Sequence, residues 1–219
     1  MKIIFIFLFI FTSWIYPQNS YLYLNGNGAY VGLPSVIINS SEFTIEAWAK
    51  TLGSGGGIEN QNILFEQRED STGDGHSTII LLTERTASIR DTRFGVRSAD
   101  RPMKVVESNF NEYGDWHHYA GVVSSKGILL YIDGDLVDST SNDQTGNYSS
   151  SIDYVDIGRH QHNSMSFGFF NGYIDEMKIW NIGKTQDEII SDMYSGQNEY
   201  NENILAYWAF DDGTATDIT

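Results

Sequence analysis

The chain has 219 residues, 29 acidic against 13 basic side chains and no cysteine, so its formal net charge is −16 at pH 7. This charge disfavours binding to nucleic acid or to anionic membranes and suits calcium, neutral sugars or basic proteins. Without disulfides, burial of apolar side chains has to stabilise the fold, and about 200 residues are enough for one sandwich or barrel with a full core.

Residues 1–19 contain one lysine followed by an apolar run, which is typical of a secretory signal peptide. The run is too short to cross a bilayer as a regular membrane helix, although an uncleaved anchor is an open alternative. We expect a secreted or cell-surface protein, and export without any cysteine favours a bacterial source. Residues 20–213 would then form the folded domain, and residues 214–219 would begin a C-terminal extension.

Most of the domain has an apolar period of two. Short runs rich in aromatic and β-branched residues, separated by Gly, Asn, Asp and Ser, predict about a dozen strands. Turn residues at 124–127 and 133–135 predict hairpins that join three consecutive strands into a meander. The main runs are YLYLN (21–25), FTIEAWAK (43–50), NILFEQ (62–67), STIILLT (77–83), WHHYAGVV (116–123), ILLYIDG (128–134) and GYIDEMKIW (172–180).

Only residues 184–196 have helical spacing. Thr185 is a suitable N-cap with Glu188 three positions later, and Gly196 is a suitable C-terminal stop. The sequence therefore predicts one short helix on an all-β body, with an apolar face made of Ile189, Ile190 and Met193.

His117 and His118 are adjacent in a predicted strand. Successive strand side chains point to opposite faces, so the two rings cannot both reach one ion or one substrate atom. We expect both histidines to be structural. The tryptophans of the strand runs are expected in the core, namely Trp48, Trp116, Trp180 and Trp208.

Five ordered motifs resemble the landmarks of the laminin-G-like and pentraxin-like jelly roll, within the concanavalin A-like lectin and glucanase superfamily. The resemblance covers nearly all of residues 21–213 and implies two packed antiparallel sheets, with the predicted helix lying against the sandwich. The motifs are YLYLNGNGAYVGLP, FTIEAWAK, GDWHHYAGVVSSKGILLYIDGDLV, IGRHQHNSMSFGFFNGYIDEMKIWNIGKTQDEI and ILAYWAFDDG.

The resemblance also points to a binding region. Pentraxin-like relatives bring two loops together at one rim and hold calcium there with acidic side chains. In this sequence the corresponding segments are the Gly-rich loop 51–61 and the polar turn 159–166. The positions that match the acidic ligands carry Asn60 and Gln61 in the first segment and Arg159 to His162 in the second, so a double calcium site is not expected. We expect instead a polar ligand-binding patch made of Asn60, Gln61, Arg159, His160 and His162.

Many members of the superfamily hold a single structural calcium near the paired termini or the sheet rim. Solvated acidic turns are the alternative explanation for such residues. The oxygen-rich candidates here are Asn25, Asn27, Asp175, Asp211 and Asp212.

Catalytic patterns are absent from the sequence. It has no E-x-D-x-x-E strand of the kind that glycosidases of this superfamily use, no cysteine and no G-x-S-x-G elbow. We expect a non-catalytic module that binds a glycan or an extracellular protein, without nucleic acid and without membrane insertion after signal cleavage. A structural or adhesin segment of a longer surface protein and a divergent glycoside hydrolase are the alternatives.

Overall fold

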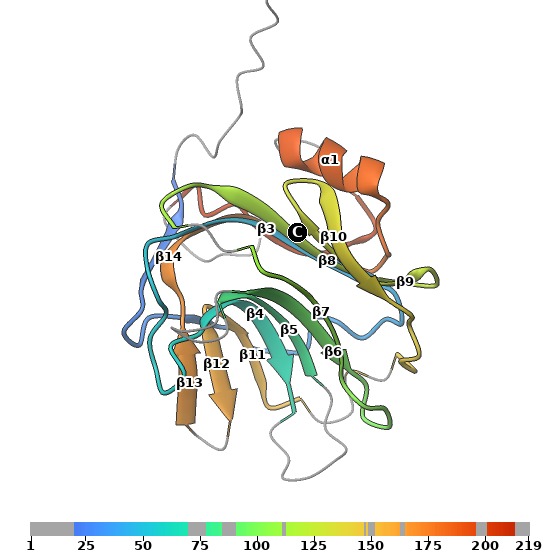
Figure 1. The fold of residues 1–219 in the computed structure, drawn as a ribbon, viewed down its shortest axis with the longest axis horizontal. Helices are drawn as coiled ribbons and strands as arrows, with labels where there is room; N and C mark the ends of the chain where they lie inside the picture. The colour runs from blue at the N-terminus through green and yellow to red at the C-terminus, as the bar shows by residue number, and fades with distance from the viewer. Residues whose placement is uncertain are drawn as a thin grey trace, which may run out of the picture.

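The computed structural model describes residues 20–69, 78–84, 91–110, 113–146, 148, 152–162, 165–195 and 201–212. The expected signal peptide, Gly196 and the expected C-terminal extension lie outside the described residues. The described chain is a sandwich of two large antiparallel sheets with one helix, as predicted (Figure 1).

The first sheet has seven strands and contains the first and last strands of the described chain. The predicted three-strand meander is confirmed, because its strands are consecutive hydrogen-bonded neighbours in this sheet. Along the sheet the order is β1 (Leu22–Asn25), β14 (Asn171–Trp180), β3 (Phe43–Thr51), β8 (His117–Ser124), β9 (Gly127–Ile132) and β10 (Asp135–Thr140), with β15 (Ile204–Trp208) also paired to β14.

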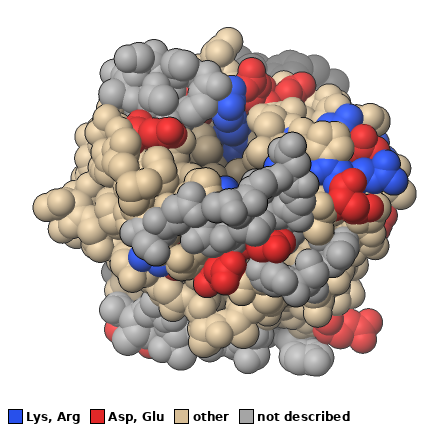
Figure 2. All heavy atoms as spheres, turned by 90° about the horizontal axis from the view of Figure 1, so that it is seen from below, with Lys and Arg blue, Asp and Glu red and all other residues tan. Residues whose placement is uncertain are grey.

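The second sheet has six strands, and a separate two-stranded hairpin lies beside it. Figure 2 views the molecule from this side and shows acidic and basic side chains in small mixed groups rather than in one continuous patch of either charge. The sheet order is β2 (Val31–Gly32), β11 (Tyr154–Ile157), β4 (Asn62–Arg68), β5 (Thr78–Glu84), β6 (Thr92–Arg97) and β7 (Lys104–Ser108), and the hairpin is β12 (Arg159–His162) with β13 (Met165–Phe169).

The main core fills the space between the sheets, and strand alternation explains which residues enter it. On β3, Phe43, Ile45 and Ala47 belong to this core, whereas the residues between them face the outer side of the first sheet. The sheets approach closely at Gly121, where an added β-carbon would lie 2.5 Å from the ring of Phe94. A glycine is therefore required at that point of β8.

Helix α1 (Gln186–Tyr194) covers part of the outer face of the first sheet (Figure 1). The predicted capping box is confirmed, because Thr185 and Glu188 bond each other's backbone N–H groups. Ile189 and Met193 are buried, whereas Ile190 is 37 % exposed and does not belong to the buried face. Nothing helical in the described part of the chain has the length and apolar character needed to span a bilayer.

Three of the four tryptophans behave as predicted. Trp48, Trp180 and Trp208 are at most 5 % exposed. Trp116 is only half-buried, because it lies just before β8 and packs at the margin of the cluster under α1.

The two end strands lie one after the other along the same side of β14. Leu22 of β1 is opposite Ile174, and Trp208 of β15 is opposite Met177. Between these positions β14 has a bulge, where Glu176 adopts a left-handed backbone conformation with φ of 51°. The described end strands thus meet through β14 rather than by pairing with each other.

Candidate functional site

The two loops expected at one rim are neighbours. Gly56 N–H donates to the carbonyl oxygen of Phe169 at 2.8 Å, and Phe169 N–H donates back to that of Gly56 at 3.1 Å. Loop 51–61 therefore lies against the β12–β13 hairpin, which contains the described part of the turn 159–166. The prediction that these segments meet is confirmed.

Two rim side chains are engaged with buried carboxylates. His160 Nδ1 lies 2.7 Å from Glu66 Oε1, and Glu66 is fully buried. Arg159 donates from Nε and Nη2 to Asp156 Oδ2 at 3.0 and 2.8 Å, and its guanidinium lies 3.5 Å from the centre of the Tyr30 ring. Loss of either side chain would remove a polar partner from a buried carboxylate, so both have a structural role.

The other rim residues differ in exposure. The rings of His160 and His162 both lie near Phe167, at centroid distances of 5.6 and 6.1 Å, so they share a face. Asn60 is exposed, whereas Gln61 is buried and donates from Nε2 to Glu59 Oε2 at 2.7 Å. The five residues share one region, and ligand binding there stays a prediction.

The calcium candidates do not form one ligand set. Asn25 is opposite Asn171, four positions before Asp175 on β14, which corresponds to about 13 Å along a strand. The Oδ1 atom of Asn25 accepts a hydrogen bond from Asn27 N–H at 2.9 Å, a local turn contact. These two asparagines therefore cannot share an ion with Asp175.

The acidic candidates near the bulge are closer together. Asp175 is buried, and its Oδ1 accepts from Glu176 N–H at 3.0 Å. Burial, with repulsion from Glu176 and Asp211, raises the pKa of Asp175 to about 8. Asp211 and Asp212 follow β15 in an exposed turn. Among the described residues no three His, Asp or Glu side chains are arranged to hold a metal ion, so calcium binding stays a prediction.

His118 points to the outer face of the first sheet and is 3 % exposed. Its ring meets Trp48 edge-on at 5.5 Å, and its Nε2 lies 3.6 Å from Glu46 Oε2. Burial, reinforced by the positive charge of Lys178, lowers the pKa of His118 to about 3. The ring is therefore neutral at physiological pH and serves as packing.

His117 points the other way, as predicted for adjacent strand residues. Its Nδ1 lies 2.8 Å from Asp133 Oδ2, and its ring packs edge-on against Phe110 at 4.8 Å. Both histidines therefore have acidic neighbours that come from other strands or turns. These acidic partners cannot be predicted from the sequence of the strand that carries His117 and His118.

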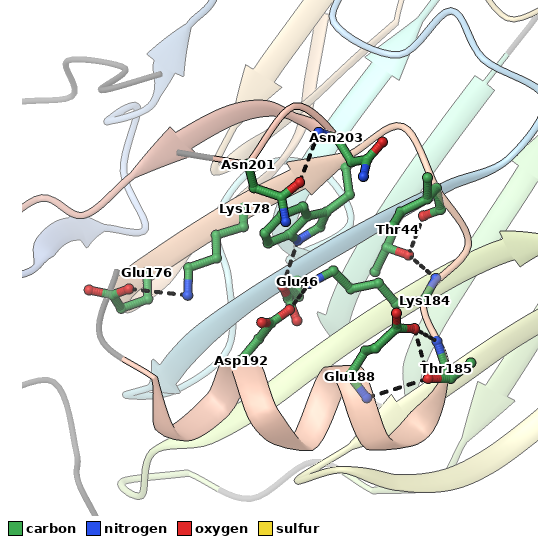
Figure 3. A network of polar contacts seen from close by, with 12 residues as sticks. Thr44, Glu46, Glu176, Lys178, Lys184, Thr185, Glu188, Asp192, Asn201 and Asn203 are labelled. Carbon is green, nitrogen blue, oxygen red and sulfur yellow. Dashed lines mark hydrogen bonds and ion pairs between the residues drawn. The ribbon is translucent and has the colours of Figure 1, made fainter. Parts of the chain in front are cut away.

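A buried polar network joins α1 to the first sheet (Figure 3). Glu46 is fully buried and accepts a hydrogen bond from Trp180 Nε1 at 2.6 Å. Lys184 Nζ lies 3.9 Å from Glu46 Oε1 and forms an ion pair with Asp192 of the helix. Burial raises the pKa of Glu46, although Lys184 opposes the effect. The network fastens the helix to the sheet, which is a structural role.

The same outer face carries an exposed aromatic cluster at the other end of β14. We call it the aromatic platform and define it as Tyr21, Tyr23, Trp116 and Tyr173. Tyr173 lies 4.6 Å from Tyr21, 5.2 Å from Tyr23 and 6.3 Å from Trp116 between ring centroids. Tyr21 and Tyr23 are 47 % and 55 % exposed, and the other two rings are half-buried.

Strand register builds this platform. Leu22 and Leu24 of β1 pack on or in the core, so Tyr21 and Tyr23 face outward. Tyr23 is directly opposite Tyr173 across the β1–β14 pair. The platform was not predicted from the sequence. The alternation of tyrosine and leucine in YLYL nevertheless places large apolar side chains on both faces of one strand, and this pattern indicates an exposed aromatic row.

Residues 25–190 match a family of the laminin G type, which is described as the concanavalin A-like lectin/glucanases superfamily. The chain belongs to this superfamily. Among curated proteins, this superfamily member is 25 % identical to mouse pappalysin-1 and 24 % identical to human pappalysin-1 over 182 residues. The match covers 81 % of this chain but only 11 % of each pappalysin.

Solved structures confirm the jelly-roll fold of this superfamily member. The CBM40 module of Ruminococcus gnavus IT-sialidase, bound to α2,3 sialyllactose, has a TM-score of 0.63 at 14 % identity, covering 80 % of this chain and 95 % of that one. Domain 4 of the extracellular arabinanase AbnA from Geobacillus stearothermophilus, in complex with arabinotriose, has a TM-score of 0.59 at 18 % identity, covering 79 % and 76 %. A Limulus polyphemus pentraxin gives 0.58 at 13 % identity, covering 90 % and 94 %.

Proposed function

We propose that this protein is a non-catalytic module that binds a glycan outside the cell, with the aromatic platform as its contact surface. The observation that carries the proposal is the cluster of four rings on an outward sheet face, in which Tyr173 contacts the other three. Large apolar groups gathered on a surface mark binding sites, because they leave apolar area in water that a ligand can cover. The C–H face of a sugar ring is suited to stack on such rings.

The size of the platform favours a glycan over a protein partner. Neighbouring strands are about 4.8 Å apart, so the row from β1 through β14 and β3 to the start of β8 is roughly 14 Å long. A stable protein interface needs about 800 Å² on each partner, whereas four rings, two of them half-buried, offer only about a few hundred Å². A short oligosaccharide matches the available surface.

The comparisons support this class of ligand by analogy. Two solved structures with the same fold hold sialyllactose and arabinotriose, and both belong to larger carbohydrate-active enzymes as separate modules or domains. Export rests on the signal-peptide pattern of residues 1–19 and on the extracellular arabinanase as an analogue. The absence of cysteine supports a bacterial source.

The test is binding of glycan-array hits, measured by calorimetry on the full chain and on the double variant Tyr23→Ala/Tyr173→Ala. Loss of two stacking rings should weaken binding about 10-fold to 100-fold. The matched control is Tyr194→Ala, which removes a tyrosine that is 46 % exposed on α1 and should leave affinity unchanged.

Melting temperatures of all variants establish that they fold. Unchanged affinity in the platform variant would contradict the proposal. A third variant, Asn60→Ala/His162→Ala, tests the rim patch that the sequence predicts. If affinity falls in the rim variant and not in the platform variant, the ligand binds at the rim and the platform is not the site.

A further inference from the structure

The aromatic platform has a lysine at its centre. Lys50 follows Trp48 on the outer face of β3 and is directly opposite Tyr173 on β14. Ala49 is opposite His117, so the next outward position places Lys50 beside Trp116 in the same row. The row therefore reads tyrosine, tyrosine, lysine, tryptophan across four neighbouring segments.

The charge of Lys50 has no ion-pair partner among the residues that the structure describes. Other basic side chains form ion pairs, such as Lys104 with Asp143 at 3.4 Å and Lys178 with Glu176 at 3.5 Å. Lys184 forms a cation–π contact in which its Nζ lies 3.3 Å from the centre of the Trp180 ring. Within the described part of the chain, no ion pair or cation–π contact engages Lys50, which is half-buried between rings.

No acidic side chain in the described part of the chain lies within ion-pair distance of Lys50. The nearest acidic residue on the same face of β14 is Asp175, two positions after Tyr173, and it is buried and accepts a hydrogen bond from Glu176 N–H. The net negative charge of the molecule acts from farther away, and physiological salt screens charges beyond about 8 Å. Lys50 thus lies beside Tyr173 and Trp116 in an otherwise acidic protein, without an ion-pair partner in the described part of the chain.

We propose that the platform binds an acidic glycan, and that Lys50 pairs with a carboxylate or sulfate group on the sugar. This inference rests on the proposed glycan-binding function and adds the chemical class of the ligand. A sugar stacked on Tyr173 or Trp116 brings its ring substituents next to the ammonium group. The flexible lysine stem lets that group reach an anion at several positions of the ring, and charge-assisted hydrogen bonds are the stronger ones.

The experiment compares ligands that differ only in charge. One pair is an oligogalacturonate and its methyl ester, which tests a carboxylate. The other is a sulfated galactan oligosaccharide and its desulfated form, which tests a sulfate. We expect wild-type protein to prefer the charged member of one pair about tenfold, as one added charge-assisted hydrogen bond supplies. The pair that shows the preference identifies the anion.

Three variants assign the preference to Lys50. Lys50→Met should bring the ratio of charged to neutral affinity close to one, and Lys50→Arg should retain a preference. The matched control is Lys126→Met in the exposed β8–β9 turn, which makes the same change in net charge and should keep the wild-type ratio. Higher salt should weaken binding of the charged ligand more in wild type than in Lys50→Met.

Equal binding of charged and neutral ligands by the wild type would overturn the inference, and so would a Lys50→Met variant that keeps the preference. Either result leaves the platform in place if Tyr23→Ala/Tyr173→Ala still loses affinity. If that aromatic variant binds as well as wild type, the proposed function itself fails. The two failures are therefore distinguishable.

Discussion

Two buried titratable residues, His118 and Asp175, give stability opposite dependences on pH. The pKa of His118 falls from 6.5 to about 3 on folding, so the unfolded chain takes up the proton first and stability decreases as pH drops below 6.5. The pKa of Asp175 rises from 3.8 to about 8, so the folded state keeps a proton that the unfolded chain loses. The stability from Asp175 is present at low pH and is lost as pH rises from 4 to 8.

The Asp175→Asn variant tests this reasoning in the window where His118 no longer titrates. Between pH 6.5 and 8 the wild-type free energy of unfolding should decline by up to about 1.4 kcal/mol per pH unit, and the variant should show a flatter profile. Urea unfolding at four pH values measures the slope. His118→Gln is the contrasting variant, because it should alter the profile only below pH 6.5. An unchanged slope in Asp175→Asn would refute the assignment.

At the scale of elements, Gly121 on β8 controls how closely the sheets approach. Because a β-carbon there would lie 2.5 Å from the Phe94 ring, Gly121→Ala should lower the free energy of unfolding by about 1 to 3 kcal/mol. Chemical unfolding of the single variant measures the loss. Adding Phe94→Leu should recover part of the lost free energy of unfolding, because the smaller leucine side chain leaves room for the added β-carbon. Additive losses in the double variant would show that the clash is not the cause.

Local signals predicted elements well where the cause lies within the element. The capping box of Thr185 and Glu188 and the two hairpin turns after β8 and β9 are contained in a few consecutive residues. The platform is different, because Tyr23, Tyr173 and Trp116 come from three distant segments and meet only through strand register. The acid partners of the histidines, Glu46 and Asp133, were missed for the same reason.

At the scale of the whole molecule, β15 is the last strand of the described chain, and it pairs with β14 and brings Trp208 into the main core at 2 % exposure. Trp208→Ala should therefore cost about 3 to 5 kcal/mol, a large part of the 5 to 15 kcal/mol typical of a domain. Denaturant unfolding gives the value. Trp116→Ala is the control at a half-exposed position and should cost clearly less. Similar losses at the two sites would contradict the burial assigned to Trp208.

The fold class followed from the period of two, whereas the packing of the strands as two antiparallel sheets came from the resemblance to a known family. Periodicity tells which side chains share a face but not which strands are neighbours. The similar aromatic runs YLYLN and LAYWAF indicate a strand near each end. The placement of β1 and β15 one after the other along β14 could not be predicted from these motifs. It depends on the bulge in β14 that separates the residues paired with β1 from those paired with β15.

The arrangement of β1 and β15 also determines how the domain would respond to a pulling force. Leu22, at the start of β1, and Trp208, at the end of β15, are opposite residues only three positions apart on β14. Tension applied through the two ends of the domain therefore acts first at the bulge and peels the strands outward from it, breaking hydrogen bonds one after another. Strands that must slide past each other break many hydrogen bonds at once and resist a larger force. We therefore expect this domain to unfold at a comparatively low force.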